Sequence, residues 1–354
     1  MRRPDNAGNH HDGWLMQAVV LVGGFGTRLR PLTNSIPKPM LPVGHVPIIE
    51  RLVRNLALGG ITDVVLALGF KPEPFLAAFP DGTVSAIGPD GTATVVHLRY
   101  AVEPQPLDTA GAIRFAAEWA GIDQTFVVAN GDIVTDLDVA ELVQFHRDRN
   151  AQATLHLTSV DDPSTFGVVQ LDAHGRVLQF VEKPAPGTEP SNLINAGTYV
   201  LEPSVLDAIA AGEKISIERV VFPALVAAGQ VFAHATDDYW LDTGTIDLFR
   251  QANLDVLAVE PHPGAHVDAS IHQSAVITNS VVDALATVDA GAQIRDSVIL
   301  AGGHVGSDAV VVDSIIMGVV GSGARVINSV LGADGVVAAD EQIEGERRPV
   351  PEPS

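Results

Sequence analysis

The chain has 354 residues, of which 43 are acidic, 21 are Lys or Arg and none is Cys. The net charge of −22 argues against a general affinity for nucleic acid or anionic lipid, because neutralising phosphates needs a surplus of cations. Without cysteine the chain has no disulfide, thiolate zinc site, iron–sulfur cluster or cysteine nucleophile.

Residues 1–15 form a polar segment ahead of the first apolar run, which begins at Met16. Two arginines are followed by no apolar stretch, so the segment does not have the pattern of a secretory signal. No run reaches the roughly 20 apolar residues that span a bilayer. His10 and His11 could touch a metal, but a solvated extension fits their polar surroundings better. We expect a cytoplasmic protein with no membrane partner.

Residues 16–255 alternate short apolar runs with helix-like stretches. Strands at this spacing, separated by helices, predict a Rossmann-like α/β domain, with a mixed, mostly parallel sheet covered on both faces. Ligands bind such sheets at the carboxyl ends of the strands. The predicted strands are Ala18–Val22, Asp63–Leu68, Val95–Tyr100 and Thr125–Val128, and the predicted helices are Ile48–Leu58 and Ala110–Ala120.

Residues 153–203 have a more antiparallel pattern. Gly167–Leu171 and Val177–Val181 flank Asp172-Ala-His-Gly175, which predicts a hairpin turn. Such an insertion could form a lid over the binding edge of the sheet.

From about Val267 the pattern changes to single β-branched residues every five or six positions. A longer unit contains Ser280, Ser297, Ser314 and Ser329 at equivalent places. Repeats of about six residues, grouped in threes, indicate a parallel β-helix in which three repeats make one coil. We expect this β-helix over 267–340. We expect 256–266, with two prolines and a glycine, to be a linker and 341–354 to be a polar tail.

The strongest local signal is a glycine turn directly after the first predicted strand, Gly23-Gly24-Phe25-Gly26-Thr27-Arg28. Glycines let backbone N–H groups approach an anion closely. Arg28 adds positive charge, and so does Lys38, which lies between two prolines that restrict its backbone. Together they predict a polyphosphate site. The turn is neither a P-loop nor the dinucleotide fingerprint, because Leu29 stands where the third glycine belongs.

These motifs resemble the sugar-phosphate nucleotidyltransferases, also called nucleotide-sugar pyrophosphorylases. The resemblance covers almost all of 16–340, and a left-handed β-helix tail is also common in that family. The motifs that carry it, in chain order, are GGFGTRLRPLT with PKPM, PLDTAGA at 106–112, NGD at 130–132, VEKP at 181–184, NAG at 195–197, SIE with FPAL, and WLDTGT at 240–245.

The resemblance implies transfer of a nucleoside monophosphate from a nucleoside triphosphate to a sugar 1-phosphate, with release of pyrophosphate. A sugar phosphate is already ionised at neutral pH, so it needs no general base. The difficulty is to bring two polyanions together, and catalysis becomes positioning plus cationic clamping.

The resemblance also implies roles for individual residues. Arg28 and Lys38 would hold the triphosphate and its leaving group as the catalytic cations. Asp132 and Asp242 would bind Mg²⁺, since carboxylates suit this hard cation. The alternative is that Asp132 is a turn residue that caps the next helix and Asp242 is an exposed acid in a loop. The nucleotide would contact Leu21, Gly23, Gly24, Gly26, Thr27, Glu103, Thr109 and Gly111. The sugar phosphate would contact Gly131, Glu182, Lys183, Asn195 and Gly197.

The PLDTAGA motif with upstream Glu103 looks most like the mannose 1-phosphate guanylyltransferase branch, which implies GTP and mannose 1-phosphate as substrates. A carboxylate suits the N–H donors of guanine, although a solvated loop acid is an equal alternative for Glu103. Asp108 departs from the family, which usually has glycine there, and WLDTGT looks more like the thymidylyltransferase branch. Another base or sugar, as in dTDP-, UDP- or ADP-glucose synthesis, therefore stays open.

The β-helix admits three interpretations. It supports a homo-oligomer, which we favour, or it binds an effector, or it carries an acyltransferase with His304 as the candidate residue. A lone histidine on a coil is more often a surface residue than a catalytic one. A non-catalytic regulatory subunit is the alternative for the whole chain, but the retained phosphate and metal residues argue against it.

Overall fold

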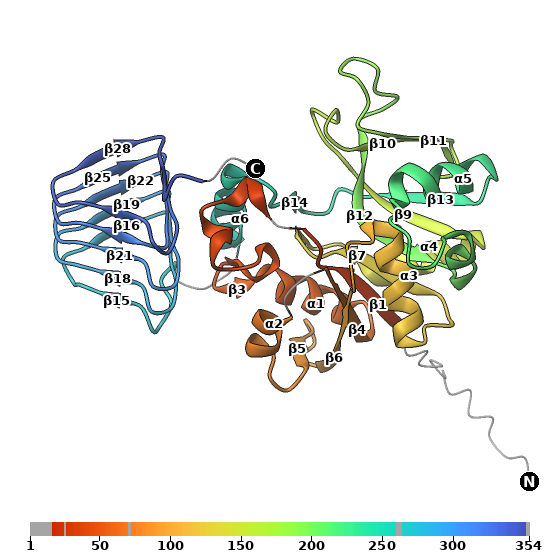
Figure 1. Ribbon diagram of the computed structural model, residues 1–354, viewed down its shortest axis with the longest axis horizontal. Helices are drawn as coiled ribbons and strands as arrows, with labels where there is room; N and C mark the ends of the chain where they lie inside the picture. Colours follow the sequence, from red (N-terminus) through yellow and green to blue (C-terminus); the bar gives the residue numbers. More distant parts are fainter. Residues whose placement is uncertain (1–15, 25, 70–71, 260–263, 352–354) are drawn as a thin grey trace, which may run out of the picture.

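The computed structural model describes residues 16–24, 26–69, 72–259 and 264–351. It places an α/β domain beside a β-helix, with helix α6 (Ile246–Val259) between them (Figure 1). The polar segment 1–15 with His10 and His11 lies outside the described residues.

The α/β domain is built on one ten-stranded mixed sheet. Its centre is the parallel run β7-β1-β4-β6, where β1 (Met16–Leu21) lies between β7 (Phe126–Asn130) and β4 (Ile61–Leu68). Antiparallel strands extend both edges. The remaining strands are β5 (Thr83–Ile87), β6 (Ala93–Val102), β9 (Ala153–Ser159), β10 (Gly167–Leu171), β11 (Val177–Glu182), β12 (Leu193–Leu201) and β13 (Val231–Ala235).

Helices cover both faces of this sheet because alternate strand residues point to opposite sides. In β1, Val19 belongs to the core under α3 (Asp108–Ala120), while Val20 belongs to the core under α1 (Ile48–Leu58). The other helices are α2 (Glu73–Ala78), α4 (Val139–Arg149) and α5 (Phe222–Ala227). The predicted Rossmann-like sheet is confirmed.

The hairpin predicted around 172–175 is also confirmed. β10 and β11 pair antiparallel, and Gly175 donates its N–H to the Asp172 carbonyl at 3.2 Å. β10 pairs in turn with β12, so the hairpin continues the main sheet at its edge. The suggestion that it forms a lid stays a prediction.

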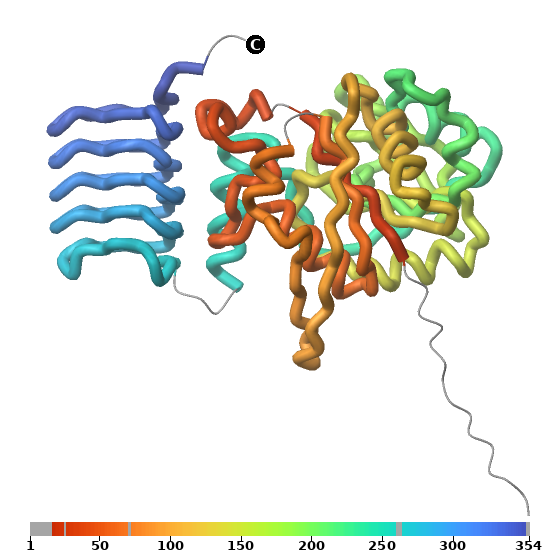
Figure 2. The backbone as a smooth tube through the Cα atoms, turned by 60° about the horizontal axis from the view of Figure 1, so that its bottom comes forward, coloured from red at the N-terminus to blue at the C-terminus, as the bar shows by residue number. Residues whose placement is uncertain are grey.

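The C-terminal domain is a left-handed β-helix of three five-stranded parallel sheets. Figure 2 shows its coils stacked in register. The strands turn mainly Val and Ile inward, with Leu331 in β26, to form the core of the β-helix. The first sheet contains β15 (Ser270–Ile271), β18 (Thr287–Val288), β21 (His304–Val305), β24 (Val319–Val320) and β27 (Val336–Val337). The second contains β16 (Val276–Thr278), β19 (Gln293–Arg295), β22 (Val310–Val312), β25 (Arg325–Ile327) and β28 (Gln342–Glu344). The third contains β17 (Val281–Val282), β20 (Val298–Ile299), β23 (Ile315–Ile316), β26 (Val330–Leu331) and β29 (Arg347–Arg348).

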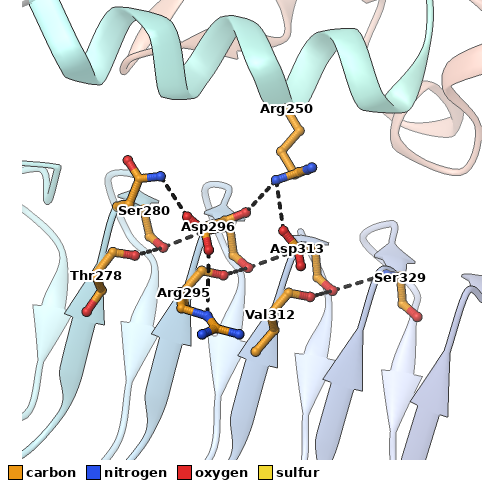
Figure 3. A network of polar contacts seen from close by, with 11 residues as sticks. Arg250, Thr278, Ser280, Arg295, Asp296, Val312, Asp313 and Ser329 are labelled. Atoms are coloured by element: carbon orange, nitrogen blue, oxygen red, sulfur yellow. Dashed lines mark hydrogen bonds and ion pairs between the residues drawn. The ribbon is translucent and has the colours of Figure 1, made fainter.

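The repeated serines form a ladder along one corner of the β-helix (Figure 3). Ser297 donates its hydroxyl to the Arg295 carbonyl at 2.7 Å and accepts the N–H of Ser314 at 3.1 Å. The same pair of bonds recurs at Ser280, Ser314 and Ser329. The ladder explains the serine spacing, because each hydroxyl satisfies buried backbone groups of two successive coils.

Two expected boundaries were wrong. Helix α6 (Ile246–Val259) continues into the expected linker, of which 260–263 lie outside the described residues. Strands β28 and β29 lie in the expected polar tail, where Ile343 stacks on Val326 inside the β-helix. A single inward residue is enough for such a strand, so the polar composition around it was misleading.

The two domains share a fourth apolar core, formed by α6, the segment around Leu29–Val43 and one sheet of the β-helix. Arg250 of α6 adds a polar clamp (Figure 3), donating to the Asp296 carbonyl at 2.9 Å and to Asp313 Oδ1 at 3.2 Å. The β-helix is therefore docked by apolar and charged contacts together. Within the described ranges, none of the helices has the length and apolar character needed to cross a bilayer.

Candidate active site

Two predicted site segments meet at the carboxyl edge of the sheet. Leu21 ends β1 and lies opposite Asn130, which ends β7. The next residue, Gly131, donates its N–H to the Leu21 carbonyl at 2.8 Å, and a Cβ there would lie only 2.8 Å from that oxygen. Gly131 therefore allows the close approach that sets Asp132 beside the glycine turn.

The glycine turn leaves open space in front of the sheet. Gly24 has φ +108° and Gly26 has φ +57°, conformations that side chains disfavour. A Cβ at Gly23 or Gly24 would meet no atom within 4 Å, whereas one at Gly26 would lie 3.2 Å from Lys38 Cβ. Packing therefore leaves no room for a side chain at Gly26, while the backbone of Gly23 and Gly24 is exposed and open to a ligand. Phe25 lies outside the described residues.

Lys38 begins the short 3₁₀ turn Lys38–Met40 behind this edge, and only 9% of its side chain is exposed. Its Nζ lies 2.6 Å from Asp132 Oδ2 and 3.2 Å from Asp242 Oδ1. Residues 38, 132 and 242 are far apart in sequence, and the fold joins them in one charge cluster. The two carboxylates offset the charge of the buried ammonium, so Lys38 has partners even when no ligand is bound.

A small separate sheet places the two carboxylates together. β8 (Ile133–Thr135) pairs antiparallel with β14 (Trp240–Asp242), and Asp242 lies opposite Ile133. The buried Thr243 donates its hydroxyl to the Asp132 carbonyl at 2.8 Å. Thr243 was not among the predicted residues, although the WLDTGT motif contains it.

Arg28 lies in the 3₁₀ turn Thr27–Leu29. A Cβ at Gly244 would lie 2.7 Å from Arg28 Nη2 and 3.0 Å from Asp242 Oδ1. The guanidinium and the carboxylate therefore face the same glycine. Thr27 and Arg28 are exposed, and so are open to a ligand.

The donor set fits a magnesium ion that is shared with substrate. Asp132 and Asp242 supply carboxylate oxygens, with 38% and 27% of their side chains exposed. Mg²⁺ usually takes one or two carboxylates together with substrate phosphates and water. No cluster of three or more His, Asp or Glu suited to a metal occurs among the described residues, so the remaining ligands would have to come from substrate and water.

The predicted sugar residues Asn195 and Gly197 form an irregular turn within β12. Asn195 donates to the Tyr199 hydroxyl at 2.8 Å and accepts the Gly197 N–H at 3.1 Å. The pairing with β9 shifts register between Asn195 and Tyr199. Trp240 donates its indole N–H to the Ala196 carbonyl at 2.8 Å, which ties this turn to the strand that ends in Asp242.

Glu182 and Lys183 follow at the end of β11. Burial and then the nearby Glu218 raise the pKa of Glu182. Lys183 has φ +50° and a side chain that is 61% exposed, with Nζ 3.9 Å from Glu182 Oε1. Its ammonium is therefore loosely paired and available to an anion.

Glu218 was missed as a site residue, although the SIE motif contains it. Its Oε2 accepts hydrogen bonds from Thr109 Oγ1 at 2.8 Å and from Ser216 Oγ at 2.6 Å. Burial, followed by the charge of Glu218, raises the pKa of the fully buried Tyr199 well above its usual range. Glu218 therefore lies near Tyr199 and near Glu182, which is one of the residues predicted to contact the sugar phosphate.

Comparisons with known proteins show which family the chain belongs to. The model of the Nucleotidyl transferase family matches residues 17–259, more than half of the chain. The chain belongs to the nucleotidyl transferase family. It is 38% identical to a mannose-1-phosphate guanylyltransferase of Mycobacterium tuberculosis over 309 residues, 84% of this chain and 83% of that protein.

Two further relatives extend the comparison. The nucleotidyltransferase is 35% identical to a probable mannose-1-phosphate guanylyltransferase 1 of rice, Oryza sativa subsp. japonica, over 92% of this chain and 93% of that one. The crystal structure of HddC from Yersinia pseudotuberculosis complexed with GMP-PN matches 68% of this chain and 99% of its own, with a TM-score of 0.55 and 26% identity.

Two residues of the nucleotidyltransferase that were expected at the nucleotide make contacts inside the protein. Gly111 packs against the segment before Glu218, where a Cβ would lie 2.5 Å from the Glu213 carbonyl oxygen. Thr109 Oγ1 donates to Glu218 and accepts the Ile217 N–H at 2.8 Å. These contacts give both residues a role in packing, and their nucleotide contacts stay a prediction.

Glu103 is anchored rather than freely solvated. Its Oε2 accepts the Leu107 N–H at 2.9 Å, and burial raises its pKa. Gly69 lies close to both Glu103 and Gly23. A Cβ added to Gly69 would be 3.9 Å from Glu103 Oε1 and 3.8 Å from the Gly23 Cα. Gly69 thus lies near both the carboxylate and the glycine turn, and the anchoring and partial burial of Glu103 weaken the alternative of a solvated loop acid.

Proposed function

We propose that this nucleotidyltransferase joins GTP and mannose 1-phosphate to give GDP-mannose and pyrophosphate. The observation that carries the proposal is the convergence of Lys38, Asp132 and Asp242 beside an open glycine turn. The relatives that match most of the chain bear the name of this activity.

The reaction forms a bond from a phosphate oxygen of mannose 1-phosphate to the α-phosphorus of GTP. The bond from that phosphorus to the oxygen of the β-phosphate breaks, and pyrophosphate leaves with the electron pair. Arg28 and Lys38 offset charge on the departing pyrophosphate. Lys183, whose ammonium is exposed, holds the sugar phosphate.

Asp132 and Asp242 would hold Mg²⁺, which would supply charge neutralisation for the substrate phosphates. Lys38 balances the two carboxylates before substrate arrives. Glu182, Asn195 and Gly197 line the sugar pocket. A sugar with a different arrangement of hydroxyls would leave one of their polar groups without a partner, and this would weaken its binding.

Glu103 is our candidate for reading the base. Guanine presents an N1–H and an exocyclic amine on one edge, and a carboxylate accepts from both. Because Glu103 Oε2 accepts the Leu107 N–H, Oε1 is the oxygen that we assign to the base. Glu103→Gln keeps the anchor but lowers acceptor strength, and should reduce kcat/KM for GTP while sparing ATP.

The test is a panel of GTP, ATP, UTP and dTTP against mannose 1-phosphate and glucose 1-phosphate with Mg²⁺. Pyrophosphate release is measured, and mass spectrometry identifies the nucleotide sugar. GDP-mannose as the preferred product supports the proposal. A preference for another base or sugar would correct the specificity, and silence throughout would favour a regulatory subunit.

We further propose that the β-helix supports a cytoplasmic homo-oligomer. Val319 and Val336 lie opposite each other on β24 and β27 and are 40% and 58% exposed. His304 shares this sheet, and its Nε2 lies 2.8 Å from Asp289 Oδ2, a pairing that suits a surface role. Sedimentation analysis of wild type and Val336→Asp tests assembly: a smaller species for the variant supports it.

A further inference from the structure

The last strand of the β-helix reaches the glycine-turn segment of the other domain. Arg347 on β29 donates from Nη1 to the carbonyl oxygens of Arg28 and Arg30, at 3.2 Å each. These partners lie 319 and 317 residues earlier in the chain. One guanidinium nitrogen thus binds two carbonyls, one within the 3₁₀ turn at Arg28 and one directly after it at Arg30.

Further contacts support the same segment from the β-helix. A Cβ on Gly332 would lie 2.8 Å from the Pro31 carbonyl oxygen, so the two backbones touch. Leu29 and Leu32 are buried in the shared core with Met317 and Val330. The backbone between residues 28 and 32 therefore rests on the final coils.

Arg28 has little support from its own turn, although its guanidinium lies near Gly244 and Asp242. Its 3₁₀ turn is three residues long and follows Gly26, which makes no side-chain cap. The Arg28 side chain is exposed. A short turn next to glycines does not by itself fix the direction of a long side chain, because glycine adds backbone freedom.

We propose that Arg347 is a positioning residue, which holds the backbone of Arg28 and Arg30 so that the Arg28 guanidinium points to the triphosphate. The inference rests on the proposed role of Arg28. A misplacement of about 1 Å by a residue outside the reacting groups can cost about 10²-fold in rate. The β-helix thereby completes the catalytic site of its own chain.

The chain offers two matched controls. Arg348, the next residue, donates to Glu341 and Glu346 at 2.8 Å inside the β-helix. Arg250 clamps the two domains through Asp296 and Asp313, on a different segment. Arg348→Ala removes the same charge from the same strand, and Arg250→Ala weakens docking without touching the glycine-turn segment.

The experiment measures kcat and KM for GTP, with melting temperature, in Arg347→Ala, Arg347→Lys and both controls. We expect Arg347→Ala to lower kcat/KM for GTP by about 10-fold or more, given the sensitivity of rate to position. Arg347→Lys should recover part of that loss, because an ammonium also donates to carbonyls. The KM for the sugar phosphate should stay near that of wild type. Equal activity losses in Arg347→Ala and either control would overturn the proposal.

A double-mutant cycle tests whether Arg347 acts through Arg28. In an Arg28→Lys background, Arg347→Ala should have a much smaller effect than in wild type, since coupled residues are not additive. An undiminished effect would overturn the inference while leaving the enzyme's function intact. If wild type shows no turnover, the proposed function fails instead. In that case calorimetry of GTP binding to wild type and Arg347→Ala tests the positioning role. The variant should bind GTP more weakly, and equal affinity would overturn the proposal.

Discussion

Thr243 and Asp132 are joined by a hydrogen bond from the Thr243 hydroxyl to the Asp132 carbonyl oxygen, at 2.8 Å. Thr243 is fully buried and directly follows Asp242. The bond therefore connects the backbones that carry both carboxylates of the charge cluster. It holds their separation fixed where Lys38 bridges them.

Thr243→Val should lower turnover and stability together. The change keeps the side-chain shape but removes the hydroxyl donor, so the Asp132 carbonyl keeps only the Thr243 N–H, at 3.4 Å. Losing one hydrogen bond should cost about 1 kcal/mol. The two carboxylates would also lose their fixed spacing, so kcat should fall. Thr243→Ser keeps the hydroxyl and should recover most of the activity. The measurements are urea unfolding and pyrophosphate release; equal activity of the Val and Ser variants would contradict this role.

Lys38→Met should expose the repulsion between Asp132 and Asp242. Turnover should fall by about 10²-fold or more, because a group that stabilises developing charge is lost. Stability should fall by about 1–2 kcal/mol, less than for a fully buried pair, since both carboxylates are partly exposed.

The same variant gives a readout for magnesium that is independent of activity. Adding Mg²⁺ should raise the melting temperature of Lys38→Met more than that of wild type, because no ammonium competes for the carboxylates. The matched control is Lys38→Met combined with Asp132→Asn, in which the shift should largely vanish. Identical shifts in all three proteins would contradict a magnesium site at this pair.

Asp108 allows charge and backbone effects to be separated. It has φ +60°, in the left-handed region, and its Oδ1 accepts the Thr109 N–H at 2.9 Å. Asp108→Gly and Asp108→Ala both remove a negative charge near the expected nucleotide, so both should lower KM for the triphosphate by a few-fold.

Only the alanine variant should lose stability through the backbone. A Cβ in the left-handed region costs about 1–2 kcal/mol when no side-chain bond compensates it. Thermal unfolding of the two variants measures this difference, and steady-state kinetics measures KM. An unchanged KM in both would show that the carboxylate lies too far from the phosphates to matter.

Much of the fold could be predicted because its signals are local. The predicted helix Ile48–Leu58 is the observed α1, whose amphipathic pattern is complete within eleven residues. The serine spacing predicted the β-helix because each coil repeats the same bonds, Ser297 to Ser314 among them. Strands β28 and β29 were missed because Ile343, the inward residue of β28, stands among charged residues.

The site was only partly predictable because its key contacts are distant in sequence. Lys38, Asp132 and Asp242 stand in motifs that could be recognised singly, but their ion pairs depend on the tertiary fold. The link from Thr109 to Glu218 spans 109 residues, and no local pattern signals it. Residues that act through backbone carbonyls, as Arg347 does, leave no motif at all.

His156 should make stability depend on pH. Burial lowers its pKa to about 4 in the folded protein, from a usual value of 6.5. Between these values the unfolded chain binds a proton that the folded chain does not, so the free energy of unfolding falls as pH falls. Its contribution is fully present above about pH 6.5 and amounts to about 3 kcal/mol over the whole window.

His156→Gln tests this contribution. Its amide can keep the contact with Thr236, which lies 2.8 Å from His156 Nε2. The measurement is the urea midpoint at pH 7 and at pH 4.5 for both proteins. Wild type should lose more stability than the variant over this interval, because glutamine does not titrate. The buried His146, whose pKa burial also lowers, is present in both proteins and cancels in the comparison. An equal loss in both would place the pH dependence in other groups, such as His146 itself.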